Sequence, residues 1–298
     1  MSGQWRVLDF LGFRGQVRSV RGGLEVFDES GHSRRVACAD LAVVLFGPGV
    51  DFSSGVMNRL MDNATVLFYC DWRGIPRGAS YPWSNHSRVG ARQIAQCEVS
   101  LPKKKNAWAK IVRAKIMGQA TTLRLKGASG AGELVALSRQ VRSGDPENLE
   151  ARAARIYWKS FLPSGVRREY GVGSDNINSC LDYGYTILRG HGIRSVLGAG
   201  LNPAFGLFHR GRGNLFHLVD DLIEPFRPAI DAAVWDIGLS ARLADPSVRK
   251  QLVAATTQKF LDDGTCIPTA FDMLAQSYGR YVEGDGARFD VPYWHEFD

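Results

Sequence analysis

The spacing of apolar residues changes near Pro82, and this change limits the possible folds more than any other feature of the chain. Before Pro82 the apolar runs are short, and Gln16–Val20 and Leu24–Phe27 flank the segment Arg21-Gly22-Gly23. Because glycine adopts positive φ angles without steric cost, paired glycines between two such runs predict a β-hairpin. The N-terminal part of the chain is therefore expected to be rich in β-structure.

Further apolar runs in the N-terminal part have the length and the boundaries of β-strands. They include Val36–Ala37, Leu41–Phe46 and Thr65–Tyr69, which are separated by turn-forming residues. Ser53–Met61 has a helical pattern instead. Strands with mixed faces predict a small β-sandwich-like domain or a folded sheet, whose exposed edges could pair with another copy. We therefore predict a dimer formed through this part.

After Pro82 the apolar residues recur at helical intervals. The first such series consists of Ala107, Ile111, Ala114, Ile116, Ala120 and Leu123. The polar region Ser84–Asn106 before it is typical of a linker or of the start of a helix. A chain of 298 residues exceeds the size that one hydrophobic core usually supports. We predict an α+β protein with a small β-sandwich-like domain at residues 1–90 and a larger all-α domain at residues 91–298.

The chain is basic, with a formal net charge of +7 at pH 7. Such a charge favours a polyanionic partner, because each neutralised phosphate releases counterions and so adds to affinity. One basic cluster follows Pro102 and consists of Lys103, Lys104, Lys105, Lys110, Arg113, Lys115 and Arg124. This cluster is either a solvated helix face or a helix that contacts phosphates, and the pattern leaves both interpretations open.

Two classes of protein are disfavoured. No apolar run reaches the roughly 18 residues that a membrane-spanning helix needs, and the N-terminus lacks a signal-peptide pattern, so we expect a cytoplasmic protein with no membrane partner. The cysteines are odd in number and form no Cys-x-x-Cys pair, which argues against a disulfide framework or a zinc cluster. We expect small buried hydrophobic residues at Cys38, Cys70, Cys97, Cys180 and Cys266.

The segment from Asp145 to Trp158 predicts a helix with a carboxylate on its apolar face. Asp145 can cap a helix whose first residue is Pro146, because proline has no N–H group to leave unpaired there. One face of that helix carries Glu150, Ala153, Ala154, Tyr157 and Phe161. An ionised carboxylate on an inward face requires a compensating cation or hydrogen-bond donor. Glu150 is thus either a metal ligand or the partner of a nearby arginine.

A second candidate, His209, ends an apolar run and opens a loop rich in glycine and arginine. In such a loop the backbone can approach a phosphate, while Arg210 and Arg212 can meet its charge. By itself, a histidine in this position is more often a hydrogen-bonded structural residue than a ligand. We interpret the nearby His217 as such a structural residue.

Two acidic residues, Asp221 and Glu224, follow at a spacing that places them on one helical face. Pro225 limits the regularity of the helix around Glu224. Asp221 is either a further acidic residue of the site or the N-cap of a helix. Together with Glu150 and His209, these residues form a set of donors suited to Mg²⁺ or Mn²⁺. A cation of that kind promotes phosphoryl transfer.

Three motifs in a fixed order give the chain a resemblance to the integrase family of CRISPR spacer acquisition. They are Glu150 with Ala153, Ala154 and Tyr157, then Gly-Leu-x-Pro-x-x-Gly-x-x-His from Gly200 to His209, and Asp-Leu-x-Glu-Pro-Phe-Arg-Pro from Asp221 to Pro228. Further similarity to the family lies in Asn178–Leu188 and in Ala114-Lys115-Ile116 with Gln119. The chain departs from the pattern where Arg-Gly-Arg-Gly follows the histidine, and its N-terminal part is similar only in general character.

The resemblance implies that Glu150, His209 and Glu224 are catalytic residues and ligands of Mg²⁺ or Mn²⁺, with Asp221 as a further acidic residue. It implies a β-rich dimerisation domain and a helical catalytic domain that binds metal and DNA. The implied activity is that of a metal-dependent DNA endonuclease and integrase, which joins the 3′-OH of short DNA fragments into a repeat array. The implied partners are DNA, a second copy of the chain and a small companion protein in a hexamer-like complex.

Four basic residues are expected to bind DNA, and two other functions are compatible with the same sequence. Arg210, Arg212, Arg227 and Lys115 are expected to contact phosphates. A metal-dependent nuclease without integration activity is the first alternative function, because the same site chemistry serves both reactions. The second is a DNA-binding scaffold with a vestigial metal site.

Overall fold

The computed structural model describes residues 6–171, 176–209, 211–284 and 286–295. The chain divides into two compact units, Met1–Trp83 and Ser84–Asp298. The division falls earlier than the expected boundary at residue 90, because helix α2 (Val89–Glu98) packs against the second unit. Its Arg92 is buried, donates a 2.6 Å hydrogen bond to the Ala199 carbonyl and pairs with Glu283. The polar region before residue 106 therefore contains a docked helix.

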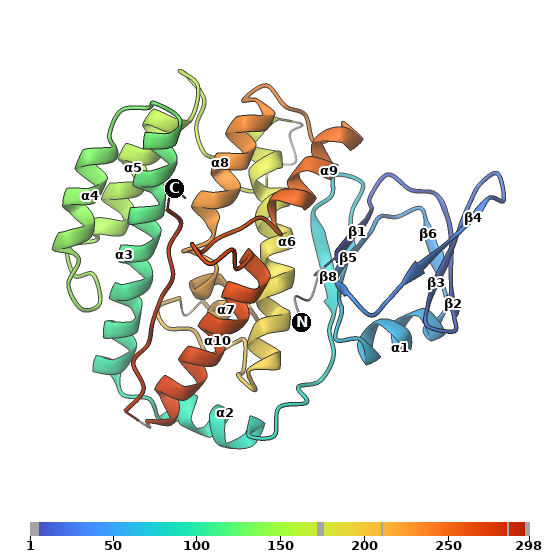
Figure 1. Cartoon of the computed structure of the whole chain (residues 1–298), viewed down its shortest axis with the longest axis horizontal. Coiled ribbons are helices and arrows are strands. Elements are labelled where there is room, and N and C mark those ends of the chain that lie inside the picture. Colours follow the sequence, from blue (N-terminus) through green and yellow to red (C-terminus); the bar gives the residue numbers. More distant parts are fainter. Residues whose placement is uncertain (1–5, 172–175, 210, 285, 296–298) are drawn as a thin grey trace. The chain divides into compact units, whose positions relative to one another are not determined.

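In the first unit, residues 6–83 form two four-stranded sheets and one helix (Figure 1). One sheet has the order β1 (Arg6–Phe10), β5 (Leu41–Phe46), β7 (Val66–Cys70), β8 (Pro76–Ser80). The other has the order β4 (Ser33–Ala37), β3 (Gly23–Asp28), β2 (Gly15–Val20), β6 (Val50–Phe52). Strands β2 and β3 are antiparallel, and Gly22 between them has a φ of 77°, so the predicted hairpin is confirmed.

The core of the first unit lies between its sheets and helix α1 (Ser54–Asp62). All six residues of β5 are buried, and β5 pairs in parallel with both β1 and β7, as expected of a central strand. The shared core includes Val17, Leu24, Leu41, Val44, Val56, Leu60 and Leu67. The predicted strands and helix of this part are thus present, and hydrophobic burial holds them together.

The second unit is helical (Figure 1). After α2 it contains α3 (Leu101–Leu125), α4 (Ala131–Gln140), α5 (Leu149–Phe161), α6 (Ile177–Gly198), α7 (His217–Leu222), α8 (Arg227–Ile237), α9 (Pro246–Ala255) and α10 (Ile267–Glu283). Helix α3 packs against α4, α5 and α8, while α6 packs against α8 and α10. The segments that carry the candidate site residues, α3, α5 and the connection from α7 to α8, therefore belong to one packed body.

Two expectations about chemical class can be compared with this structure. None of the helices in the described ranges is long and apolar enough to cross a membrane. All five cysteines are free, and three of them are buried, but Cys97 is exposed and Cys266 is partly exposed. The expectation that every cysteine is a buried hydrophobic residue is wrong for those two.

Candidate active site

Glu150 lies in the first turn of α5, and an upstream carboxylate fixes the start of that helix. Asp145 accepts hydrogen bonds of 2.9 Å from the backbone N–H groups of Leu149 and Glu150. The expected N-cap is therefore wrong in position, since the N-cap is Asn148 and the helix does not begin at Pro146, but the Asp145 side chain does bind the first N–H groups of the helix. Asp145 and Asn148 have φ angles of 46° and 51°, so the chain makes a turn there and helical geometry starts at Leu149.

The predicted apolar face of α5 is confirmed, because Ala153, Tyr157 and Phe161 are all buried. At the start of that face Glu150 meets a cation, as its position required. The partner is not an arginine: Glu150 Oε1 lies 2.6 Å from Nζ of Lys115, which projects from the middle of α3. Burial alone would lower the pKa of Lys115, but Glu224 and Glu150 outweigh it and raise that pKa.

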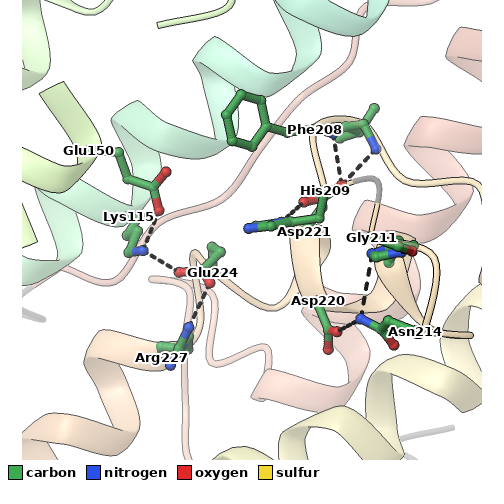
Figure 2. Close-up of polar contacts among 12 residues, drawn as sticks. Lys115, Glu150, Phe208, His209, Gly211, Asn214, Asp220, Asp221, Glu224 and Arg227 are labelled. Atoms are coloured by element: carbon green, nitrogen blue, oxygen red, sulfur yellow. Dashed lines mark hydrogen bonds and ion pairs between the residues drawn. The ribbon is translucent and has the colours of Figure 1, made fainter. Parts of the chain in front are cut away.

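Glu224 reaches the same ammonium group from a different part of the chain. Its Oε2 lies 2.6 Å from Lys115 Nζ, and its Oε1 accepts a 2.6 Å hydrogen bond from Arg227 (Figure 2). Burial would raise the pKa of Glu224, but Arg227 and Lys115 together lower it to about 2. We call Lys115, Glu150, Glu224 and Arg227 the carboxylate–lysine cluster.

The contacts of the two Glu224 oxygens differ in quality. Oε1 has a well-aligned hydrogen bond from Arg227, whereas buried Oε2 has no well-aligned donor among the described residues. Its 2.6 Å contact with Lys115 is therefore an ion pair by distance alone. A buried carboxylate oxygen without a directional donor retains lone pairs for a cation.

The expected helical face shared by Asp221 and Glu224 is wrong. Helix α7 ends at Leu222, and Glu224 lies in the turn before α8. Pro225 and Pro228 remove two backbone N–H donors from this region, which limits a regular helix through it. The turn directs Glu224 to Lys115 while Asp221 points elsewhere (Figure 2).

Asp221 organises the loop that carries the histidine. Its fully buried carboxylate accepts hydrogen bonds from the N–H groups of Leu207 at 2.6 Å and Phe208 at 3.0 Å. Its other oxygen lies 2.5 Å from His209 Nδ1. Asp221 is therefore not an N-cap, since it lies late in α7 and binds a different segment.

The contact with Asp221 decides which nitrogen of His209 is free to bind a cation. A carboxylate at Nδ1 favours the tautomer with its proton there, which leaves Nε2 as an acceptor. The Asp221 hydrogen bond is also the main reason that the pKa of His209 is raised, and the charges of Glu224 and Glu150 add to it. In Figure 2 the ring edge opposite Asp221 faces the side on which Lys115 and Glu224 lie.

The three predicted ligands therefore lie in one region, but they do not share one partner. Glu150 and Glu224 converge on Lys115, while His209 is bound to Asp221. In the part of the chain that the structure describes, no three His, Cys, Asp or Glu side chains are grouped closely enough to hold a metal ion. The donors nevertheless suit a hard divalent cation, because two carboxylates already share one cation and one of their oxygens lacks a directional donor.

The expected DNA contacts fall into three groups. Arg212 is exposed, whereas Lys115 and Arg227 are largely buried and paired with the glutamates. Arg210 lies outside the described residues. His217 is buried, with Nε2 2.5 Å from the Gly211 carbonyl oxygen, consistent with its interpretation as a structural residue.

Sequence reasoning did not identify two features beside the site. Phe208, half exposed, stacks on buried Trp108 with a centroid distance of 4.6 Å, and the His209 ring lies edge-on to the same indole. In addition, buried Asp231 of α8 accepts hydrogen bonds from Tyr157 at 2.8 Å and from Tyr185. Tyr157 lies on the apolar face of α5, and its hydroxyl group was the one sequence signal for a buried polar partner. Phe208 and Trp108 are far apart in the sequence, so no local pattern predicts that they stack.

Comparison with known proteins gives a consistent result. Residues 12–245 match the family described as CRISPR associated protein Cas1. The CRISPR-associated endonuclease Cas1 of Neisseria meningitidis serogroup C (strain 8013) is 32% identical over 233 residues, 76% of each chain. A second such endonuclease, from Pyrobaculum aerophilum, is 26% identical over 282 residues, which cover 89% of this chain and 95% of that protein.

Solved structures show the same fold at low sequence identity. A CAS1 protein from Thermotoga maritima has a TM-score of 0.78 at 15% identity and covers 95% of this chain and 98% of its own. A casposase bound to integration product has a TM-score of 0.77 at 16% identity, with 97% and 93% covered. A chain of a Cas6-RT-Cas1–Cas2 complex has a TM-score of 0.77 at 18% identity; the match spans all of this chain but 37% of that longer one.

Proposed function

The chain belongs to the Cas1 family of CRISPR-associated endonucleases, and from this membership and the geometry of its site we propose that it is a metal-dependent DNA endonuclease and integrase. In this proposal it joins the 3′-OH of short DNA fragments into a CRISPR repeat array by phosphoryl transfer. The observation that carries the proposal is the convergence of Glu150 and Glu224, from separate segments, to 2.6 Å from one ammonium group.

Glu150, Glu224 and His209 would hold Mg²⁺ or Mn²⁺ at this place. When bound, such a cation polarises a phosphodiester and stabilises charge on the attacking and leaving oxygens. Asp221 keeps the His209 ring oriented with Nε2 available, and Arg227 anchors one oxygen of Glu224. The protein supplies position and charge and forms no covalent intermediate in this mechanism.

The partners in this proposal are DNA, a second copy of the chain and a small companion protein. Support comes from the net charge of +7 and from the likeness to a casposase bound to integration product and to a Cas6-RT-Cas1–Cas2 complex. The N-terminal unit would form the homodimer, since it has sheet edges that can pair. The homodimer and the companion protein would together form the hexamer-like complex that presents the fragment to the repeat.

A strand-transfer assay tests the proposal. Purified protein is mixed with its companion protein, a labelled short duplex, a supercoiled plasmid carrying the repeat, and Mn²⁺. Wild type is compared with His209→Ala and with the control His295→Ala, which removes a histidine whose Nε2 lies 2.7 Å from Asp262. We expect joined product from wild type and the control, and none from His209→Ala or after addition of EDTA.

Other results of the same assay would support one of the two alternative functions. Metal-dependent cleavage without joining would identify a nuclease without integration activity. DNA binding with neither reaction would identify a scaffold with a vestigial site. Full joining by His209→Ala would overturn the metal assignment.

A further inference from the structure

Lys115 lies in a position that is unusual for a lysine, because its side chain is largely buried. Its side chain is 13% exposed, and its ammonium group lies 2.6 Å from one oxygen of Glu150 and 2.6 Å from one oxygen of Glu224. Two carboxylates this close to a common point, one of them buried and the other 20% exposed, repel each other unless a cation compensates them. Lys115 thus supplies the charge that keeps α5 and the turn before α8 together at the site.

The same point cannot hold both the ammonium group and a divalent cation. Mg²⁺ binds carboxylate oxygens at about 2.0–2.1 Å, and Ca²⁺ at about 2.3–2.6 Å. A cation bound to the two oxygens that now contact Lys115 Nζ would overlap the ammonium group. When Lys115 leaves the pair, it loses a 2.6 Å hydrogen bond to Glu150 Oε1 and an ion pair with Glu224 Oε2, and only the first of these contacts is a well-aligned hydrogen bond.

The two cations of the carboxylate–lysine cluster differ in their freedom to move. Arg227 is held by its hydrogen bond to Glu224 and by stacking 4.1 Å above the ring of Tyr185. The lysine has a flexible four-carbon stem. It also borders a cavity of about 40 Å³, which is lined by Trp158, Tyr170 and Tyr185 among others and lies beside the ammonium group.

We propose that Lys115 is the resident cation of the Glu150–Glu224 pair and competes with the divalent cation, which binds only when the ammonium group leaves the pair. Lys115 therefore keeps the site assembled without metal and lowers its metal affinity. This inference rests on the proposed function, because it assumes that the glutamates bind a divalent cation. It assigns to Lys115 a role inside the site in place of the expected contact with DNA phosphate.

Calorimetric titration with Mn²⁺ alone, without DNA, tests the competition. Lys115→Met and Lys115→Gln remove the charge, and Lys115→Arg keeps it. The matched control is Lys126→Met. Lys126 lies directly after the last residue of α3, its side chain is also 13% exposed, and its Nζ lies 2.5 Å from Asp236 Oδ1. We expect Mn²⁺ to bind the two neutral variants about tenfold more tightly than wild type, because they lack the competing state. Lys115→Arg should bind no more tightly than wild type, and Lys126→Met should match it.

Thermal unfolding gives a second measurement that does not depend on activity. Without metal, the neutral variants should melt below wild type, and saturating Mn²⁺ should raise their melting temperature more than that of wild type. Equal or weaker Mn²⁺ binding by both neutral variants would overturn the competition. Absence of Mn²⁺ binding in every protein, wild type included, would overturn the proposed metal site itself, and so the two failures are distinguishable.

Discussion

Glu224 and Asp231 are both buried acids beside Arg227, yet their surroundings are opposite in character. Glu224 is paired with two cations, which lower its pKa to about 2, so it is held as a carboxylate. Asp231 accepts hydrogen bonds from two neutral tyrosine hydroxyls, and burial raises its pKa to about 6. Both acids are buried, so burial alone does not distinguish Glu224, the proposed metal ligand, from Asp231. The difference between them is the ammonium group that lies between Glu224 and a second carboxylate.

The largest difference between the two acids is expected in catalysis. Glu224→Gln should lower DNA cleavage and joining by about 1,000-fold or more. The substitution removes a negative charge that would hold the divalent cation beside the reacting phosphate. Asp231→Asn keeps a polar group of the same size among the tyrosines and should stay within a few-fold of wild type. Initial rates with a labelled DNA substrate measure both. Equal losses of rate in the two variants would show that Glu224 is no more important for catalysis than Asp231.

A smaller difference is expected in the pH dependence of stability. The pKa of Asp231 is about 6 in the folded protein, against an ordinary 3.8, because burial disfavours its charged form. Its stabilising contribution is complete below about pH 3.8 and is lost as the pH rises through about 6. Asp231→Asn has no such loss, so the variant should gain on the order of 2–3 kcal/mol relative to wild type between pH 4 and 7.

Urea unfolding of both proteins at several pH values measures this change. The difference between the two free energies of unfolding isolates Asp231 from other groups that titrate in the same range, such as His209. A difference that does not vary between pH 4 and 7 would mean that Asp231 is charged in the folded protein. The two acids would then not differ in their state of charge in the folded protein.

Much of the fold could be predicted from the sequence because it depends on local patterns. The hairpin around Gly22, the buried strand Leu41–Phe46 and the apolar face of α5 each follow from the spacing of residues close together in the chain. The predictions that failed concern turns. The start of α5 depends on positive φ angles at Asp145 and Asn148, and no periodicity encodes them.

The site could be predicted only in part, for a similar reason. The need of Glu150 for a cation followed from its place on an apolar face, but the identity of that cation depended on packing between α3 and α5. Lys115 stands within a run of basic residues, where its pattern indicated a solvated or phosphate-binding face. Asp221 and Glu224 share a motif, but the turn after Leu222 separates their partners.

Glu224, and not Asp231, is the acid that we propose to bind a divalent cation together with Glu150 and His209. Calorimetric titration of wild type, Glu224→Gln and Asp231→Asn with Mn²⁺ tests this claim directly. We predict one binding site in wild type and in Asp231→Asn, and loss of that site in Glu224→Gln. Mn²⁺ binding by Glu224→Gln with the affinity of wild type, or loss of binding in Asp231→Asn alone, would contradict it.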